Sequence, residues 1–266
     1  MSTEKIAIKN RHGLKLVIQV EAPANPKNLV FIAHGQGGFM GQVHIQAFAD
    51  VYLANNFRVV RFDATHALGE SEGDIIDVTY TSYIEDLEDV INWARTQPWF
   101  QQPFSLCGHS MGAQSTAWYA EHHPAEVASL ATMAPVVNYD LYINTLDSQE
   151  VQGWKAKGYK ETVSRSKPGV KKRIGWGVNE SLKKFDIVPG APNLIMPVLD
   201  VVGESDDGCP YEHQQIFMDA VASKDKKLVQ IAGLEHSYRD NKTLQYDEKL
   251  NRVKNALNTW LKSLNT

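Results

Sequence analysis

Several classes of protein are excluded by what the sequence contains little of. Only two cysteines, Cys107 and Cys209, occur in 266 residues, which excludes a fold held together by a disulfide framework. No run of about 18 apolar residues is present, so no segment is expected to span a bilayer. Positive charge is not in excess, because 27 basic residues stand against 31 acidic ones and the formal net charge is −4. This balance argues against a nucleic-acid-binding protein, which needs a basic footprint.

The N-terminal residues and the composition point to an ordinary globular protein. The first ten residues are polar and lack the apolar stretch of a signal peptide, so we expect a cytoplasmic protein. With 43% hydrophobic and 22% charged residues, the composition is not that of a disordered chain. A chain of this length buries roughly three quarters of its unfolded surface, so it can form a core without metal or disulfide staples.

Short apolar runs alternate with longer helical patterns along most of the chain. The apolar and polar alternation at 14–21 is typical of a half-buried strand. Five short apolar runs indicate parallel strands covered on both faces, at 29–33, 58–62, 104–107, 198–202 and 228–231. Helical patterns lie between them, at 45–54, 83–96, 113–122, 211–221 and 244–264. This order predicts an α/β fold with a mostly parallel, doubly wound sheet and helices on both faces.

The alternation stops between residues 136 and 193. This stretch, called the insertion below, is rich in Lys, Gly, Tyr and Trp and contains a basic run at 165–173. Nearly sixty residues are too many for a simple loop, so the insertion is either a small cap or a disordered lid. Its aromatic content favours a cap. We therefore predict a core made of 1–135 and 194–266, with a cap at 136–193.

The strongest local signal is Gly108-His-Ser-Met-Gly112, which lies between a strand-like run and a helix-like run. A nucleophilic serine on a tight strand-to-helix turn needs small residues two positions before and after it, because the backbone is crowded there. Such a turn lifts the Ser110 hydroxyl out of the sheet and aims the Met111 amide at a developing oxyanion. The pattern recurs at Gly69-Glu-Ser-Glu-Gly73 without a strand directly before it. Its two carboxylates would oppose an anion, so we interpret Ser71 as a loop residue.

A nucleophilic serine also needs a general base, an acid that orients the base, and a second oxyanion donor. His236 follows the last strand-like run, and the adjacent Asp206 and Asp207 follow the run before it. Ser, Asp and His thus come in that order, each at the carboxyl end of a predicted strand, where an open α/β sheet places its site. The glycine-rich turn His34-Gly-Gln-Gly-Gly38 follows another strand and is able to present an amide.

Together these motifs resemble those of the α/β-hydrolase superfamily, and the resemblance covers nearly the whole chain. The turn HGQGG resembles the oxyanion loop of that family, which implies that Gln36 donates its backbone amide. The sequence GHSMG resembles the nucleophile elbow, with Ser110 as nucleophile and Met111 as the second amide donor. We expect His34 and His109, which flank these residues, to orient loops or to pack rather than to act as bases.

The resemblance extends to the acid, the base and the insertion. GESDD is similar to the acid turn, where the acid usually lies three residues after the glycine, which implies Asp206 over Asp207. LEHSY is similar to the base loop and implies His236. Monoacylglycerol lipases, feruloyl (cinnamoyl) esterases and related serine hydrolases carry their caps between the sixth and seventh strands, the place of the insertion. Residues 61–73 also resemble a loop of those esterases, although Ala67-Leu68 stands where a single glycine is usual.

The resemblance implies a serine carboxylesterase that hydrolyses small to medium acyl or aryl esters through an acyl-enzyme intermediate. No metal or organic cofactor is needed, and the expected partner is a small-molecule ester. A C–C bond hydrolase, a thioesterase and an aminopeptidase would use the same residues. A non-catalytic small-molecule receptor is the alternative from another class. The sequence leaves the oligomeric state open, a homo-oligomer included.

Charged residues of the insertion bear on these alternatives. An aminopeptidase would need carboxylates there to hold the substrate amine, and six are available: Asp140, Asp147, Glu150, Glu161, Glu180 and Asp186. The basic run is typical of a solvated face. A competing hypothesis is that Lys171, Lys172 and Arg173 favour an acid-bearing substrate.

Overall fold

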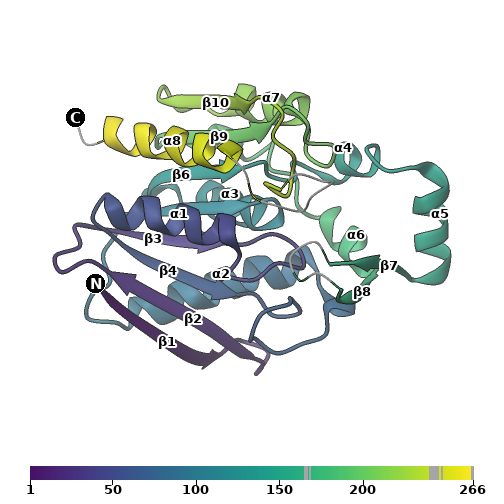
Figure 1. Ribbon diagram of the computed structural model, residues 1–266, viewed down its shortest axis with the longest axis horizontal. Coiled ribbons are helices and arrows are strands. Elements are labelled where there is room, and N and C mark those ends of the chain that lie inside the picture. Colours follow the sequence, from purple (N-terminus) through teal and green to yellow (C-terminus); the bar gives the residue numbers. More distant parts are fainter. Residues whose placement is uncertain (165–166, 168, 240–245, 247, 265–266) are drawn as a thin grey trace.

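The fold is built around a central eight-stranded sheet. The computed structural model describes residues 1–164, 167, 169–239, 246 and 248–264. The strand order is β1-β2-β4-β3-β5-β6-β9-β10 (Figure 1). The pairs β1–β2 and β2–β4 are antiparallel, and all other neighbours are parallel. The predicted mostly parallel sheet is therefore confirmed. Its strands are β1 (Ser2–Lys9), β2 (Lys15–Ala22), β3 (Asn28–Ala33), β4 (Phe57–Asp63), β5 (Phe104–His109), β6 (Val127–Met133), β9 (Val198–Gly203) and β10 (Lys226–Ile231).

Helices cover both faces of this sheet, as expected. In Figure 1, α1 (Val43–Ala54) and α8 (Glu248–Ser263) lie in front of the sheet, and α2 (Tyr80–Arg95) and α3 (Met111–His122) lie behind it. Strand β3 shows how the two cores form, because alternate side chains enter opposite faces. Val30 and Ile32 pack with α1 and α8, whereas Phe31 packs with α2 and α3. Helix α7 (Tyr211–Ala220) contributes Phe217 to the second core.

Most predicted elements are present, with shifted ends. Helix α2 begins three residues before the predicted start, because a capping box stabilises its first turn. The Thr79 side chain accepts from the Ser82 amide, and the Ser82 side chain accepts from the Thr79 amide. The predicted helix at 244–264 corresponds to α8, and residues 244, 245, 247, 265 and 266 lie outside the described residues. Strands β1 and β6 were not predicted.

The insertion contains short elements between β6 and β9. They are α4 (Tyr139–Ile143), α5 (Ser148–Lys157), β7 (Tyr159–Val163), β8 (Lys171–Gly175), α6 (Gly177–Leu182) and the short turn η3 (Ala191–Asn193). Strands β7 and β8 pair antiparallel in a two-stranded sheet of their own. Buried Trp154 joins α5 to this hairpin, since its indole N–H donates to the Ile174 carbonyl at 2.9 Å. Residues 165, 166 and 168 of the basic run lie outside the described residues.

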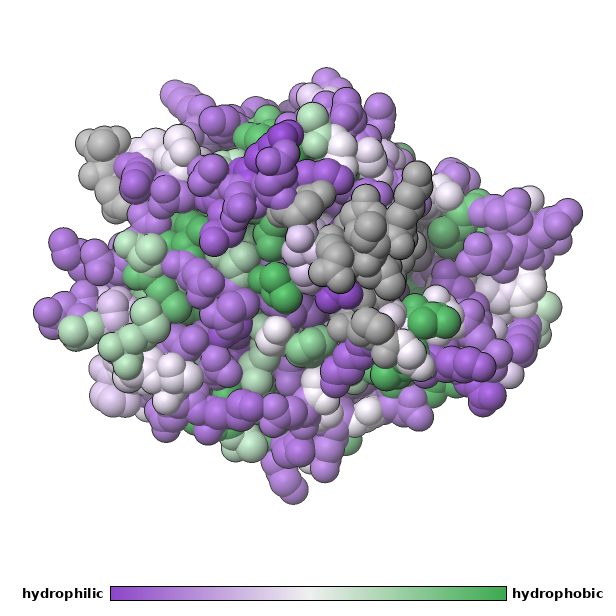
Figure 2. Space-filling model, in the orientation of Figure 1, coloured by the Kyte–Doolittle hydropathy of each residue, from purple (hydrophilic) through white to green (hydrophobic). Residues whose placement is uncertain are grey.

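The hairpin also packs on the core. Gly175 approaches the turn η1 (Ile75–Asp77) so closely that a Cβ there would collide with the Ile76 carbonyl oxygen. On the face in Figure 2, hydrophilic residues dominate and hydrophobic ones form scattered small areas. Within the described ranges, no helix is long and apolar enough to cross a membrane. Both cysteines, Cys107 and Cys209, are buried free thiols.

Candidate active site

Ser110 lies on a sharp turn between β5 and α3. Its backbone has φ 55° and ψ −120°, a conformation that costs a non-glycine residue free energy and is found at functional sites. The Ser110 amide donates to the Met133 carbonyl at 3.0 Å, which holds the turn on the neighbouring strand. A Cβ at Gly108 would collide with the start of α3, and one at Gly112 would collide with the backbone at the end of β3. The small residues of the motif are therefore required by this crowding.

A continuous chain of hydrogen bonds runs from Ser110 to Asp206. His236 Nε2 lies 2.9 Å from Ser110 Oγ, and His236 Nδ1 lies 2.8 Å from Asp206 Oδ2. The other carboxylate oxygen, Oδ1, accepts from the amides of Gly208 at 3.1 Å and Cys209 at 2.8 Å. Asp206 is 5% exposed. The structure thus brings the three predicted residues together although they are far apart in sequence.

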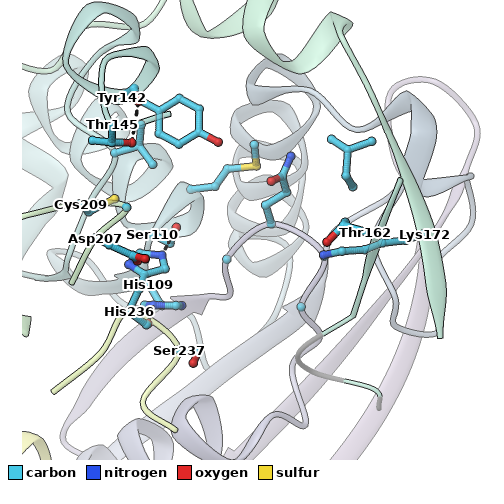
Figure 3. Close-up of a pocket in the computed structure, with 18 of the residues that line it drawn as sticks. His109, Ser110, Tyr142, Thr145, Thr162, Lys172, Asp207, Cys209, His236 and Ser237 are labelled. Carbon is cyan, nitrogen blue, oxygen red and sulfur yellow. Dashed lines mark hydrogen bonds between the residues drawn. The ribbon is translucent and has the colours of Figure 1, made fainter. Parts of the chain in front are cut away.

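Asp207, the alternative acid, lies differently from its neighbour. Its side chain is exposed, whereas Asp206 is buried against His236. In Figure 3, Asp207 lies at the edge of the pocket near His236. The geometry therefore favours Asp206 as the partner of the imidazole.

Two further histidines hold the loops around Ser110. His109 Nε2 donates to the His236 carbonyl at 3.0 Å, which fixes the loop carrying the imidazole. His34 Nδ1 donates to the Gly35 carbonyl at 2.8 Å, and its Nε2 accepts from the Ala64 amide at 3.0 Å. Burial lowers the pKa of both imidazoles, so both are neutral at pH 7. These contacts agree with the expectation that His34 and His109 orient loops.

The loop at 34–38 lies directly beside Ser110. A Cβ on Gly35 would lie 3.1 Å from the Ser110 Cβ. The Gly35 carbonyl accepts from the Tyr83 hydroxyl and from the Gly38 amide, each at 3.0 Å. Because the C=O and the following N–H of a trans peptide point in opposite directions, the Gln36 amide points away from Tyr83. Gln36 lines the pocket that contains Ser110.

Met111 occupies the first turn of α3, immediately after Ser110. The first N–H groups of a helix have no intrahelical acceptor, and the helix dipole makes this end partially positive. Met111 lines the same pocket as Gln36. The 34–38 loop with Gln36 and the first turn of α3 with Met111 therefore both border the pocket at Ser110.

A pocket of about 490 Å³ opens above Ser110 and His236 (Figure 3). Core loops form one side, and the insertion forms the other. Its described apolar and aromatic lining residues, apart from histidines, are Tyr80, Met111, Val136, Tyr142, Leu146, Val163, Ile174 and Tyr246. Its ionisable lining groups besides histidines and tyrosines are Glu150, Lys160, Lys172, Asp207, Cys209 and Arg239. A mostly enclosed organic group of modest size fits such a space.

Sequence reasoning missed two supporting residues, Tyr83 and His44. The His44 ring stacks on Tyr238 with centroids 5.0 Å apart and meets the edge of His109 at 4.8 Å. Burial lowers the pKa of His44 to about 3, so it acts as a neutral packing group. Tyr83 begins one predicted helix and His44 directly precedes another, so nothing local marks either residue. In the described part of the chain, no three His, Cys, Asp or Glu side chains are grouped as a metal site needs.

The second G-x-S-x-G pattern has a structural role. Ser71 Oγ accepts from the Val17 amide at 2.8 Å and donates to the Asp63 carbonyl at 2.5 Å. The Asp63 carboxylate accepts from the amides of Met40 and Glu70, each at 2.7 Å. The interpretation of Ser71 as a loop residue is confirmed, since its hydroxyl ties the 61–73 loop to the sheet.

Comparisons with known proteins give relatives in sequence and similar folds. Monoglyceride lipase of Rattus norvegicus is 22% identical over 278 residues, covering 95% of this chain and 88% of the relative. The human monoglyceride lipase is 23% identical over 261 residues, covering 89% and 82%. The solved structure "Ferulic Acid bound to Est1E from Butyrivibrio proteoclasticus" is similar with a TM-score of 0.79 and 20% identity, covering 97% of this chain and 98% of that one.

A further solved structure, alpha/beta hydrolase domain-containing protein 10 from mouse, is similar with a TM-score of 0.76 and 16% identity, covering 98% of this chain and 99% of that one. Residues 24–181 match the family described as "Hydrolase_4: Serine aminopeptidase, S33". This match spans more than half of the chain. The chain therefore belongs to the Hydrolase_4 family and is an enzyme of the α/β-hydrolase fold.

Proposed function

We propose that this α/β-hydrolase is a serine carboxylesterase that cleaves small to medium acyl or aryl esters. The observation that carries the proposal is the hydrogen-bond chain from Ser110 through His236 to Asp206. Its serine end lines a pocket large enough for a small organic molecule. Serine, histidine and carboxylate in this arrangement activate a hydroxyl for attack on a carbonyl carbon. Relatives named monoglyceride lipase support an ester as the substrate.

The reaction has two halves. His236 Nε2 takes the Ser110 proton as Oγ attacks the ester carbonyl, and Asp206 stabilises the resulting imidazolium. The amides of Gln36 and Met111 bind the tetrahedral oxyanion, each contributing on the order of 3 kcal/mol to transition-state stability. His236 then protonates the leaving alcohol. Water, activated by the same imidazole, releases the acid from the acyl-enzyme.

The insertion (136–193) acts as a cap that sets substrate size. Its apolar side chains, including Tyr142, Leu146 and Ile174, face Ser110 across the pocket. A volume of about 490 Å³ accommodates a medium acyl chain or a substituted aromatic acid. The solved structure that contains ferulic acid supports an aryl ester among the candidates.

An ester fits this pocket better than a free amine does. Of the six insertion carboxylates that an aminopeptidase would use, Glu150 alone lines the pocket. It is paired with Lys160 at 3.2 Å, so its charge is already balanced. Asp207 is a further carboxylate at the pocket, on the His236 side. An aminoacyl-nitroanilide therefore belongs in the substrate panel as the discriminating compound.

The test is a panel of p-nitrophenyl esters of increasing acyl length, with methyl ferulate, an acyl-CoA and an aminoacyl-nitroanilide alongside. Wild type and Ser110→Ala are compared, and Ser71→Ala serves as the control because it removes the serine of the second G-x-S-x-G pattern. We expect esters to be turned over by wild type and Ser71→Ala, with turnover lost in Ser110→Ala. Esterase activity retained by folded Ser110→Ala would refute the assignment. Turnover of the nitroanilide alone would indicate a peptidase.

A further inference from the structure

Lys172 is set apart from the neighbouring cations of the basic run by its strand register. In the hairpin, Lys160 pairs with Ile174 and Thr162 pairs with Lys172, so these four side chains share one face. All four line the pocket above Ser110. Lys171 and Arg173 alternate with them and are exposed.

The opposite face of the hairpin has its own contacts. Arg173 pairs with Glu161 at 3.1 Å and lies over the Tyr159 ring at 5.0 Å. Lys171, Lys172 and Arg173 all line a second hollow between the hairpin and η1, but of the three only Lys172 also lines the pocket above Ser110. Strand β8 therefore carries one cation that reaches the pocket above Ser110 between two cations that do not, and these two provide matched controls.

The ammonium group of Lys172 lies beside the oxyanion loop. A Cβ on Gly37 would lie 2.6 Å from Lys172 Nζ, so the ammonium packs close to the Gly37 backbone. In Figure 3, the Lys172 side chain reaches in from the hairpin, on the opposite side of the pocket from Asp207 and His236. A group attached to the substrate carbonyl or its alcohol meets this ammonium if it extends towards the hairpin.

Two carboxylates are found among the described residues that line the pocket, those of Glu150 and Asp207. Of the two, Glu150 is nearer to Lys172 in sequence, and it is paired with Lys160. Asp207 lies on the far side, and Arg239 lies 4.6 Å above the Tyr246 ring. Ile174, which shares a hairpin face with Lys172, adds apolar surface to this wall of the pocket. Apolar walls strengthen the attraction between this cation and an anion, because fewer water molecules screen it.

We propose that Lys172 forms an anion subsite and that the preferred substrates are esters that also carry a free carboxylate. The proposal rests on the esterase function proposed above and names its substrate class. The Nζ donates charge-assisted hydrogen bonds to the carboxylate while the ester carbonyl lies at Ser110. Such bonds correspond to about ten- to a hundredfold in affinity.

The experiment uses two matched pairs of esters. One pair carries the charge on the acyl side, as 4-nitrophenyl hydrogen suberate against its methyl-capped diester. The other carries it on the alcohol side, as 4-carboxyphenyl against 4-(methoxycarbonyl)phenyl hexanoate. We expect wild type to prefer the anionic member of at least one pair in kcat/KM. Lys172→Met loses that preference by about ten- to a hundredfold while neutral esters change less than about twofold.

Three controls make the result specific. Lys171→Met removes a cation from the same strand and keeps the preference, and Lys172→Arg keeps it as well. Added salt weakens the preference of wild type, because Lys172 is only half-buried. Thermal unfolding confirms that each variant is folded.

Two results would overturn the proposal. One is equal loss of anionic and neutral ester turnover in Lys172→Met, which would show that Lys172 only supports the oxyanion loop. The other is the absence of an anionic preference in both pairs. Calorimetric titration of Ser110→Ala, with and without Lys172→Met, by the same four esters separates this proposal from the esterase function. Carboxylate-selective binding that depends on Lys172, without turnover by wild type, would keep the subsite and refute the esterase.

Discussion

Replacing Asp206 by asparagine tests how the site holds its imidazole. The two amides on Oδ1, from Gly208 and Cys209, require an acceptor, so the amide oxygen of Asp206→Asn must face them. The new NH₂ group then faces His236 Nδ1, which has to become the acceptor. The imidazole proton moves to Nε2, where it faces Ser110 Oγ at 2.9 Å and blocks proton uptake. The side chain keeps its size and its burial.

We expect kcat/KM of Asp206→Asn to fall about 10⁴-fold, the effect of imposing the wrong tautomer in such a triad. This corresponds to about 5–6 kcal/mol of transition-state stabilisation. The assay is hydrolysis of a p-nitrophenyl ester at pH 7.5, with circular dichroism to check folding. Asp207→Asn is the matched control and should stay within about threefold of wild type because that side chain is exposed. A loss below tenfold in Asp206→Asn, or an equal loss in Asp207→Asn, would contradict the reasoning.

Three other predictions follow from buried contacts. Gly112→Ala should lower the free energy of unfolding, measured in urea, by about 1–3 kcal/mol, because the added Cβ overpacks against the backbone at the end of β3. Gly153→Ala should raise it by about 0.5–1 kcal/mol, because a Cβ there meets open space within a helix. A change of the same sign in both variants would contradict this account. His109→Phe should reduce kcat about five- to tenfold in the ester assay by removing the donor to His236, and an unchanged kcat would show that this bond is unimportant. Burial raises the pKa of Asp200 from 3.8 to about 8, so between these values the folded state binds the extra proton and stability falls as pH rises. Asp200→Asn should remove about 1.4 kcal/mol of that fall per pH unit. The check is the free energy of unfolding in urea, measured for both proteins from pH 5 to 8. The same pH dependence in wild type and variant would rule this prediction out.

The elements that the sequence predicts well are those with a strong local pattern. Strands β3, β4, β5 and β9 are dense in apolar residues, and helix α8 shows a clear stripe of buried residues one turn apart: Leu250, Val253, Leu257, Trp260 and Leu261. Strand β6 is equally central but reads VASLATM, whose small and hydroxyl residues give a weak strand signal. Its burial comes from its two neighbours in the sheet. Strand β1 is missed for the opposite reason, because it is an exposed edge with charged residues.

The candidate site divides in the same way. Ser110, His236 and the acid turn each follow a predicted strand, so local motifs and chain order are sufficient to propose them as a site. The supporting contacts join residues that are remote in sequence. Tyr83 lies 48 positions from its acceptor Gly35, and His109 lies 127 positions from His236. Such pairs depend on how the helices and loops pack, which no local pattern reports.

The separate hydrogen-bond ladder of the β7–β8 hairpin has a consequence for evolution. Its strands pair with each other in a sheet of their own, apart from the eight strands that carry Ser110 and its partners. We therefore expect mutations, insertions or exchange of this hairpin to leave the proposed catalytic groups in place while the molecules admitted to them change. Diversification within such a lineage is expected to accumulate in the hairpin, and a transplanted hairpin is the natural unit for redesign.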